Sequence, residues 1–158
     1  MPAIIRRHQI GKQSVEANDL VENTIQIAIP IHLLAKSVSV AIDSTGVKER
    51  TGSFTLTSEM VKHLKEAYLE ARADAPSATD AKVDVELYNE SDGAVVTSVS
   101  FEGEGGSKIS NNIADTLKTL TGKVLCGRIN VTTASATAGA TQTFCSIVLR
   151  LVLSLIHI

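Results

Sequence analysis

The chain has 158 residues, of which 44% are hydrophobic and 20% charged, and its formal net charge is −2 at pH 7. This length and composition indicate one globular domain with a core of its own, and they exclude disordered and collagen-like chains. The nearly balanced charge argues against nucleic-acid binding through an overall basic surface. Three Phe, two Tyr and no Trp leave few aromatic rings for stacking bases or sugars.

The first 22 residues are polar and show no sustained hydrophobic period. Their basic side chains are Arg6, Arg7, His8 and Lys12. We interpret residues 1–22 as an exposed arm that contacts a neighbouring subunit or packaged nucleic acid; an ordinary solvated terminus has the same composition. No stretch suits a secretory signal or reaches the roughly 18 apolar residues of a membrane helix. We therefore expect a soluble protein, cytoplasmic or in a virion, without a membrane partner.

Residues 25–33 alternate isoleucine with smaller or polar residues, which predicts a strand with one buried face. The side chains expected on that face are Ile25, Ile27, Ile29, Ile31 and Leu33. Pro30 has no N–H to donate, so this strand is expected at a sheet edge or at a bulge. The same alternation predicts a second strand at 38–42 and a short third one at 54–56.

The hydrophobic period then becomes helical, and we predict a helix over residues 57–73. Its apolar stripe consists of Met60, Leu64, Ala67, Tyr68 and Ala71. Thr57 or Ser58 can cap the first amides of this helix, and Pro76 follows its end.

A hairpin is predicted next, with strands at 83–88 and 95–101 joined by a turn that contains Asp92-Gly93. The remaining predicted elements are a glycine-rich loop at 102–108, a helix at 111–121 capped by Gly122, and strands at 124–131 and 143–152.

Seven strands with two inserted helices predict a mainly β fold, an antiparallel β-sandwich or jelly-roll-like barrel over residues 23–152. We expect the two short helices to cap open ends of the sandwich. A two-layer α+β arrangement is the alternative.

The two cysteines, Cys126 and Cys145, lie on the last two predicted strands, which we expect to pair as a hairpin. The register that keeps the apolar faces together places Cys145 among buried side chains and Cys126 on the opposite face. A disulfide between them is disfavoured by this register.

No group of residues forms a recognisable catalytic, cofactor or metal site. His32 and His63 stand outside any metal-binding spacing. In the glycine-rich loop, Lys108 is not followed by the Ser or Thr of a phosphate-binding loop, and Glu102 and Glu104 place negative charge where phosphate would lie. We expect no enzyme activity, cofactor or metal.

The stretch 132–142 is small, uncharged and rich in Thr and Ala. It is interpreted as a hairpin loop, or as strand ends flat enough to pack against another subunit. The predicted contact residues beyond the arm are Pro30, Thr132, Thr133, Ser135 and Thr137.

The last six residues, Leu-Ser-Leu-Ile-His-Ile, resemble the translation of the transposase mosaic-end adapter used in short-read library preparation. We interpret residues 153–158 as a sequencing scar, which would place the true C-terminus beyond the sequence shown. A natural apolar strand end is the other interpretation.

Together these features predict a homo-oligomerising β-sandwich, for which viral capsid or filament subunits are examples. The alternative is a small binding module for a ligand or protein, with its site in the loops at 44–52, 102–108 and 132–142.

Overall fold

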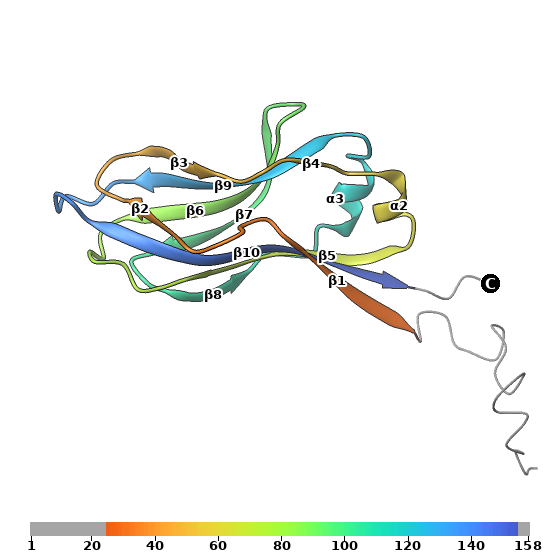
Figure 1. Ribbon diagram of the computed structural model, residues 1–158, viewed down its shortest axis with the longest axis horizontal. Helices are drawn as coiled ribbons and strands as arrows, with labels where there is room; N and C mark the ends of the chain where they lie inside the picture. Colours follow the sequence, from red (N-terminus) through yellow and green to blue (C-terminus); the bar gives the residue numbers. More distant parts are fainter. Residues whose placement is uncertain (1–24, 155–158) are drawn as a thin grey trace, which may run out of the picture.

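Alternation of apolar and polar residues is the main local pattern, and it produces a protein built almost entirely of strands. The computed structural model describes residues 25–154, which form two antiparallel β-sheets packed face to face (Figure 1). The predicted mainly β sandwich with two short helices is confirmed. The predicted arm, with Arg6, Arg7, His8 and Lys12, and the last four residues lie outside the described residues.

In chain order the strands are β1 (Gln26–His32), β2 (Val38–Ala41), β3 (Gly46–Arg50), β4 (Phe54–Thr55), β5 (Leu64–Ala73), β6 (Lys82–Asn89), β7 (Ala94–Glu102), β8 (Gly106–Ile109), β9 (Val124–Thr133) and β10 (Thr141–Ser154). The helices are α2 (Ser58–Val61) and α3 (Ala114–Lys118). Within residues 25–154, neither helix has the length or the apolar run needed to cross a membrane.

The strands pair in a nested order, early with late. β1 and β2 pair with β10, β3 and β4 with β9, β5 with β8, and β6 with β7. The first sheet has the order β1-β10-β5-β8 and the second β3-β9-β6-β7. This is the strand order of a long hairpin rolled into a sandwich, the jelly roll.

The rolled ribbon gives the molecule two different ends. The β2–β3, β5–β6, β7–β8 and β9–β10 connections meet at one, which we call the loop end (Figure 1). Helices α2 and α3 lie at the other, the helix end, where β1 starts and β10 finishes. The expected position of helices at an open end of the sandwich is thus observed, with both at the same end.

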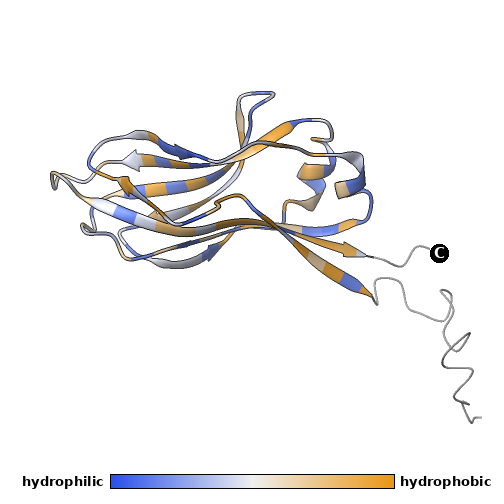
Figure 2. Cartoon of the chain, viewed as in Figure 1, coloured by the Kyte–Doolittle hydropathy of each residue, from blue (hydrophilic) through white to orange (hydrophobic). Residues whose placement is uncertain are grey.

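The core lies between the sheets, where every second residue points inward. Figure 2 shows the resulting alternation of hydrophobic and hydrophilic residues along the strands. Phe101 of the second sheet and Phe144 of the first are both fully buried, with ring centroids 5.6 Å apart at an interplanar angle of 85°. This edge-to-face contact joins the two sheets.

The predicted helix over residues 57–73 is wrong for most of its length. Thr57 does cap a helix, accepting a hydrogen bond from the Met60 amide at 3.4 Å, but α2 ends at Val61 and β5 follows. The ten residues of β5 also fit the two-residue period of a strand, because the buried residues Ala67 and Leu69 alternate with half-buried Glu66 and Tyr68. β5 is bonded on both edges, by β10 and β8, and this tertiary context outweighs helix-forming composition.

The predicted hairpin of the last two strands is also wrong, because β9 and β10 belong to opposite sheets. Both cysteines are free. Cys126 lies on the outer face, as predicted, yet it is fully buried. Cys145 is only half-buried, contrary to prediction, because a bulge between Phe144 and Ser146 moves it off the inward face.

Two shorter predictions are corrected in detail. The second helix is confined to α3, and Thr119 rather than Gly122 is its C-cap. The glycine-rich loop contains the start of β8, and a Cβ at Gly103 or Gly105 would overlap the backbone of the β5–β6 connection. These two glycines therefore permit close packing of chain segments at the loop end. The hairpin of β6 and β7 is confirmed.

Replacing Phe101 by Ala should lower the free energy of unfolding by about 3–5 kcal/mol, because it leaves a cavity between the sheets. In a double-mutant cycle with Phe144→Ala, the two changes should couple by about 0.5–1.5 kcal/mol. Urea unfolding followed by circular dichroism measures both quantities. The exposed Val95→Ala is the control, expected within about 0.5 kcal/mol of wild type. A loss below about 1 kcal/mol for Phe101→Ala would contradict this role.

Candidate subunit interface

β1 is an outer strand of the first sheet, as Pro30 predicted. β1 pairs only with β10 among the described strands, and the Leu33 amide donates to the Ile147 carbonyl at 2.8 Å in the same register. Because alternate residues of a strand bond the same neighbour, Ile27, Ile29 and Ile31 bond β10 while Pro30 points its backbone to the free edge. Its missing N–H therefore costs no ladder hydrogen bond.

The isoleucines of β1 share one face, but only part of it is buried as predicted. Leu33 is buried and Ile31 packs against the core, whereas Ile25, Ile27 and Ile29 are exposed. Ile27 lies opposite Leu153 and Ile29 opposite Leu151, on the core side of the sheet. Leu151 is 2% exposed, whereas Ile27 is 44% and Ile29 40% exposed. The difference follows the position of β1, which is the outer strand of its sheet and packs chiefly against β10.

We call Ile25, Ile27 and Ile29 the isoleucine stripe. Within residues 25–154, the exposed large hydrophobic residues are Ile25, Ile27, Ile29, Val47, Val95 and Ile109. Half of them form the stripe, so exposed apolar surface is concentrated at β1. Contiguous apolar surface of this kind marks contact sites on soluble proteins.

β1 is the longest of the edge strands without a charged residue, which also include the short strands β2 and β4. It carries no Asp, Glu, Lys or Arg, whereas β3 carries Lys48, Glu49 and Arg50, β8 carries Lys108 and β7 ends at Glu102. Charged side chains and proline both protect a free edge against unwanted pairing, and of these β1 has only Pro30.

The other predicted contact residues gather at the loop end. Thr132, Thr133 and Thr137 are exposed there, whereas Ser135 is 5% exposed and donates its hydroxyl to Asp80 at 2.5 Å. The structure does not bring these residues to Pro30, which lies opposite Arg150, roughly 30 Å along β10 from Thr141.

Two carboxylates hold the connection between β9 and β10. Besides the Ser135 hydroxyl, Asp80 accepts a hydrogen bond from the Ala136 amide at 2.9 Å, and Asp43 accepts one from the Gly139 amide at 2.8 Å. The hydroxyl of Ser135, followed by the amide of Ala136, lowers the pKa of Asp80. The stretch is therefore a tethered loop, as one of its two interpretations expected.

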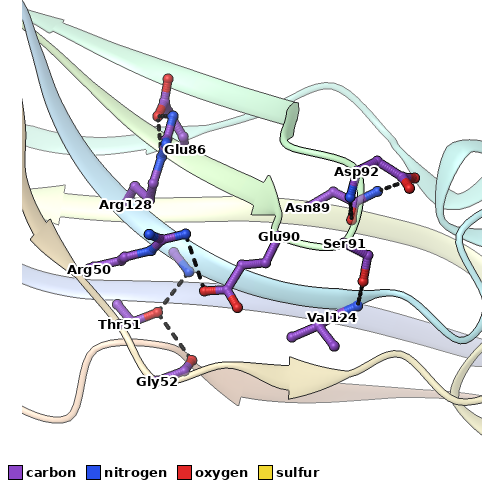
Figure 3. A network of polar contacts seen from close by, with 11 residues as sticks. Arg50, Thr51, Gly52, Glu86, Asn89, Glu90, Ser91, Asp92, Val124 and Arg128 are labelled. Carbon is purple, nitrogen blue, oxygen red and sulfur yellow. Dashed lines mark hydrogen bonds and ion pairs between the residues drawn. The ribbon is translucent and has the colours of Figure 1, made fainter.

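A polar cluster covers part of the outer face of the second sheet (Figure 3). The Arg128 guanidinium lies 3.6 Å from the Tyr88 ring centroid and donates to Glu86 at 2.7 Å, with side chains 16% and 7% exposed. Arg50 lies 5.4 Å from the same ring and pairs with Glu90 at 3.3 Å. Sequence patterns did not single out these residues, because only the register of β9 against β3 and β6 brings them together.

This cluster explains the burial of Cys126. The thiol interacts with Glu90 and Arg50, and burial, followed by the Glu90 hydrogen bond, raises its pKa. A fully buried thiol of raised pKa is a poor nucleophile, so Cys126 has a structural role in this cluster.

Other surface features are less specific. A hollow of about 380 Å³ lies on the outer face of the first sheet, with Arg72 between the short side chains of Ser107 and Ser146. In the part of the chain that the structure describes, no three His, Cys, Asp or Glu side chains are placed to hold a metal ion.

Comparison with known proteins gives little further information. No protein-family model matches the chain, and no curated protein matches it. Among solved structures it is similar to "Structure of infectious bursal disease virus Gx strain", with a TM-score of 0.44 and 12% identity over 83% of this chain. The match covers 32% of that viral chain, so this chain spans about a third of its length.

Acid should loosen the loop that Asp80 holds. Because its pKa is lowered in the folded state, the stabilisation is complete above the ordinary Asp pKa and is lost as the pH falls through the folded value. Hydrogen exchange at the Ala136 amide, corrected for intrinsic rates, should therefore lose protection below about pH 4. Asp80→Asn should lower this protection at neutral pH and remove its acid dependence. The control is Asp115→Asn on α3; an unchanged profile in Asp80→Asn would contradict the assignment.

Proposed function

We propose that this chain is a non-enzymatic structural subunit that assembles with copies of itself, as the subunits of a viral capsid or a filament do. The observation that carries the proposal is the isoleucine stripe on an uncharged edge strand. A protein that acts alone would have to keep this apolar margin in water.

The free energy expected from burying the isoleucine stripe suits a contact that is repeated many times in an assembly. Burying the exposed part of each isoleucine in the stripe contributes about 1 kcal/mol, before the cost of association. One such contact is weak, but a subunit in a closed or helical assembly makes several contacts at once, and these strengthen one another.

The jelly-roll topology supports the same proposal, since capsid subunits are among the proteins built on it. Lectins and cupins share this fold, so topology by itself does not select a function. The small number of aromatic rings weighs against a sugar-stacking surface. The stripe is the feature that distinguishes an assembly role here.

The alternative, a binding module, is favoured by one observation: parts of the three predicted loops meet at one end of the sandwich. The prediction of a loop at 44–52 is otherwise wrong, because residues 46–50 form β3, and β8 begins within the predicted loop at 102–108. Their polar groups, however, largely bond one another. Asp43 and Asp80 hold the 134–140 loop, and Gln142 donates to the carbonyl oxygens of Asp74 and Glu104 at 3.0 Å. A loop end whose polar groups bond one another suits a rigid structural subunit better than a surface that recognises a ligand.

Assembly should be visible directly. The full chain should form particles or filaments under negative-stain electron microscopy, or oligomers whose mass in light scattering rises with concentration. Apolar burial grows in strength when salts such as sulfate are added, so assembly should be promoted by them. A chain that stays strictly monomeric at high concentration would contradict the proposal.

The arm can be tested separately for nucleic-acid binding in the full chain. If Arg6, Arg7 and Lys12 contact phosphates, changing all three to Ala should reduce the slope of log affinity against log salt by about 3. The matched control changes the exposed Lys36, Lys62 and Lys65 to Ala. Equal slopes for wild type and arm variant would remove nucleic acid from the proposed partners, leaving self-assembly untouched.

A further inference from the structure

We infer that two copies of the chain pack isoleucine stripe against isoleucine stripe about a two-fold axis. The contact joins the faces of the two β1 strands and does not extend the sheet from edge to edge. This inference rests on the proposed self-assembly and specifies the contact through which it occurs.

The free edge of β1 is poorly suited to strand pairing. Among the described residues, Ala28, Pro30 and His32 direct their backbone away from β10 to this edge. Pro30 lies among them, has no N–H to donate, and places its ring on the edge. A strand added here would lose hydrogen bonds near the middle of the ladder, so the backbone edge gives a partner little to bind.

The core-side face of β1 offers the opposite chemistry. Ile29 stands beside Leu151 of β10, and Ile27 lies opposite Leu153, which belongs to the stretch interpreted above as a sequencing scar or a natural strand end. Ile27 and Ile29 are substantially exposed, and the buried Leu151 packs beside them. A partner that covers this face gains apolar burial without any strand pairing.

The absence of charge on the patch favours a second copy as the partner. β1 has no formal charge, and Arg150, the one charged residue on the paired length of β10, lies opposite Pro30 on the outer face and is held by Glu70 at 2.6 Å. A two-fold contact places each patch against itself, which a charged patch would resist by like-charge repulsion. An acidic or basic partner would find no complementary charge here.

The position of the stripe makes this contact accessible. β1 is the outermost strand of its sheet, and it runs with the end of β10 along the margin at the helix end (Figure 1). The exposed isoleucines therefore lie at the margin of the sandwich, where a second copy can approach them.

The first experiment compares three variants of the full chain by sedimentation velocity. Ile27→Lys/Ile29→Lys places four like charges in the two-fold contact and should weaken dimerisation at least a hundredfold. The matched control is Val95→Lys/Ile109→Lys, which changes residues of equal or greater exposure, 47% and 55%, on other edge strands. It should stay within threefold of wild type.

The third variant, Pro30→Val, separates face packing from edge pairing. It restores a donor at the free edge, so edge pairing would tighten association tenfold or more. Face packing leaves the affinity within threefold of wild type. Circular dichroism of each variant verifies that the sandwich has formed.

A cross-linking experiment identifies what covers the stripe. In a Cys145→Ser background, Ile29→Cys should give a covalent dimer with a short bismaleimide, and Val95→Cys should give none. If the Ile29→Cys protein yields no dimer, the inference is overturned. The same result is expected if residues 1–24 of the same chain cover the stripe.

The outcomes separate the two proposals. Loss of dimer in the stripe variant alone, with Pro30→Val unchanged, supports the two-fold contact. Assembly that survives the stripe variant, or tightens in Pro30→Val, overturns that contact and leaves the proposed self-assembly standing. A wild-type chain that remains monomeric overturns both.

Discussion

The hydrogen-bonding demands of β10 shape the rest of the structure. This strand has 14 residues, and both of its edges must be satisfied. β5 bonds one edge, while β1 and β2 divide the other, β1 on residues 148–154 and β2 on 141–144. Between β1 and β2 the chain must therefore turn away from this edge of β10 and then return to it. The first sheet, the exposed margin at β1 and the position of Pro30 all follow from this arrangement.

Local patterns predicted the elements whose partners are close in sequence, and failed where the partner is distant. The β6–β7 hairpin could be predicted from its turn residues and from the alternation of apolar and polar residues alone. In β5, residues 64–73 fit a helix and a strand equally well, and the choice was made by β10 and β8, which lie far along the chain. The consecutive strands β9 and β10 have apolar faces that could pair, yet β9 pairs with β3, β4 and β6, and β10 pairs with β1, β2 and β5.

For the candidate interface, the sequence predicted which isoleucines share a face and that Pro30 marks an edge. It could not predict that Ile27 and Ile29 are exposed, because exposure depends on which distant segments pack over a face. The same limit applies to Cys126, whose cover of Arg50 and Glu90 exists only in the folded register. Side-chain direction follows from a strand's own period, whereas burial follows from what lies opposite.

Nested pairing of early strands with late ones also orders events during synthesis. β1 leaves the ribosome before the other described strands, and its partner β10 leaves after them. Until β10 emerges, β1 lacks its neighbour and β5 has only β8, and folding must close long loops before the contacts with β10 form. A surface carried by β1 is consequently presented only after β10 has been made. In the proposed assembly, incomplete chains would therefore lack the contact surface, and this timing would restrict assembly to chains whose first sheet is complete.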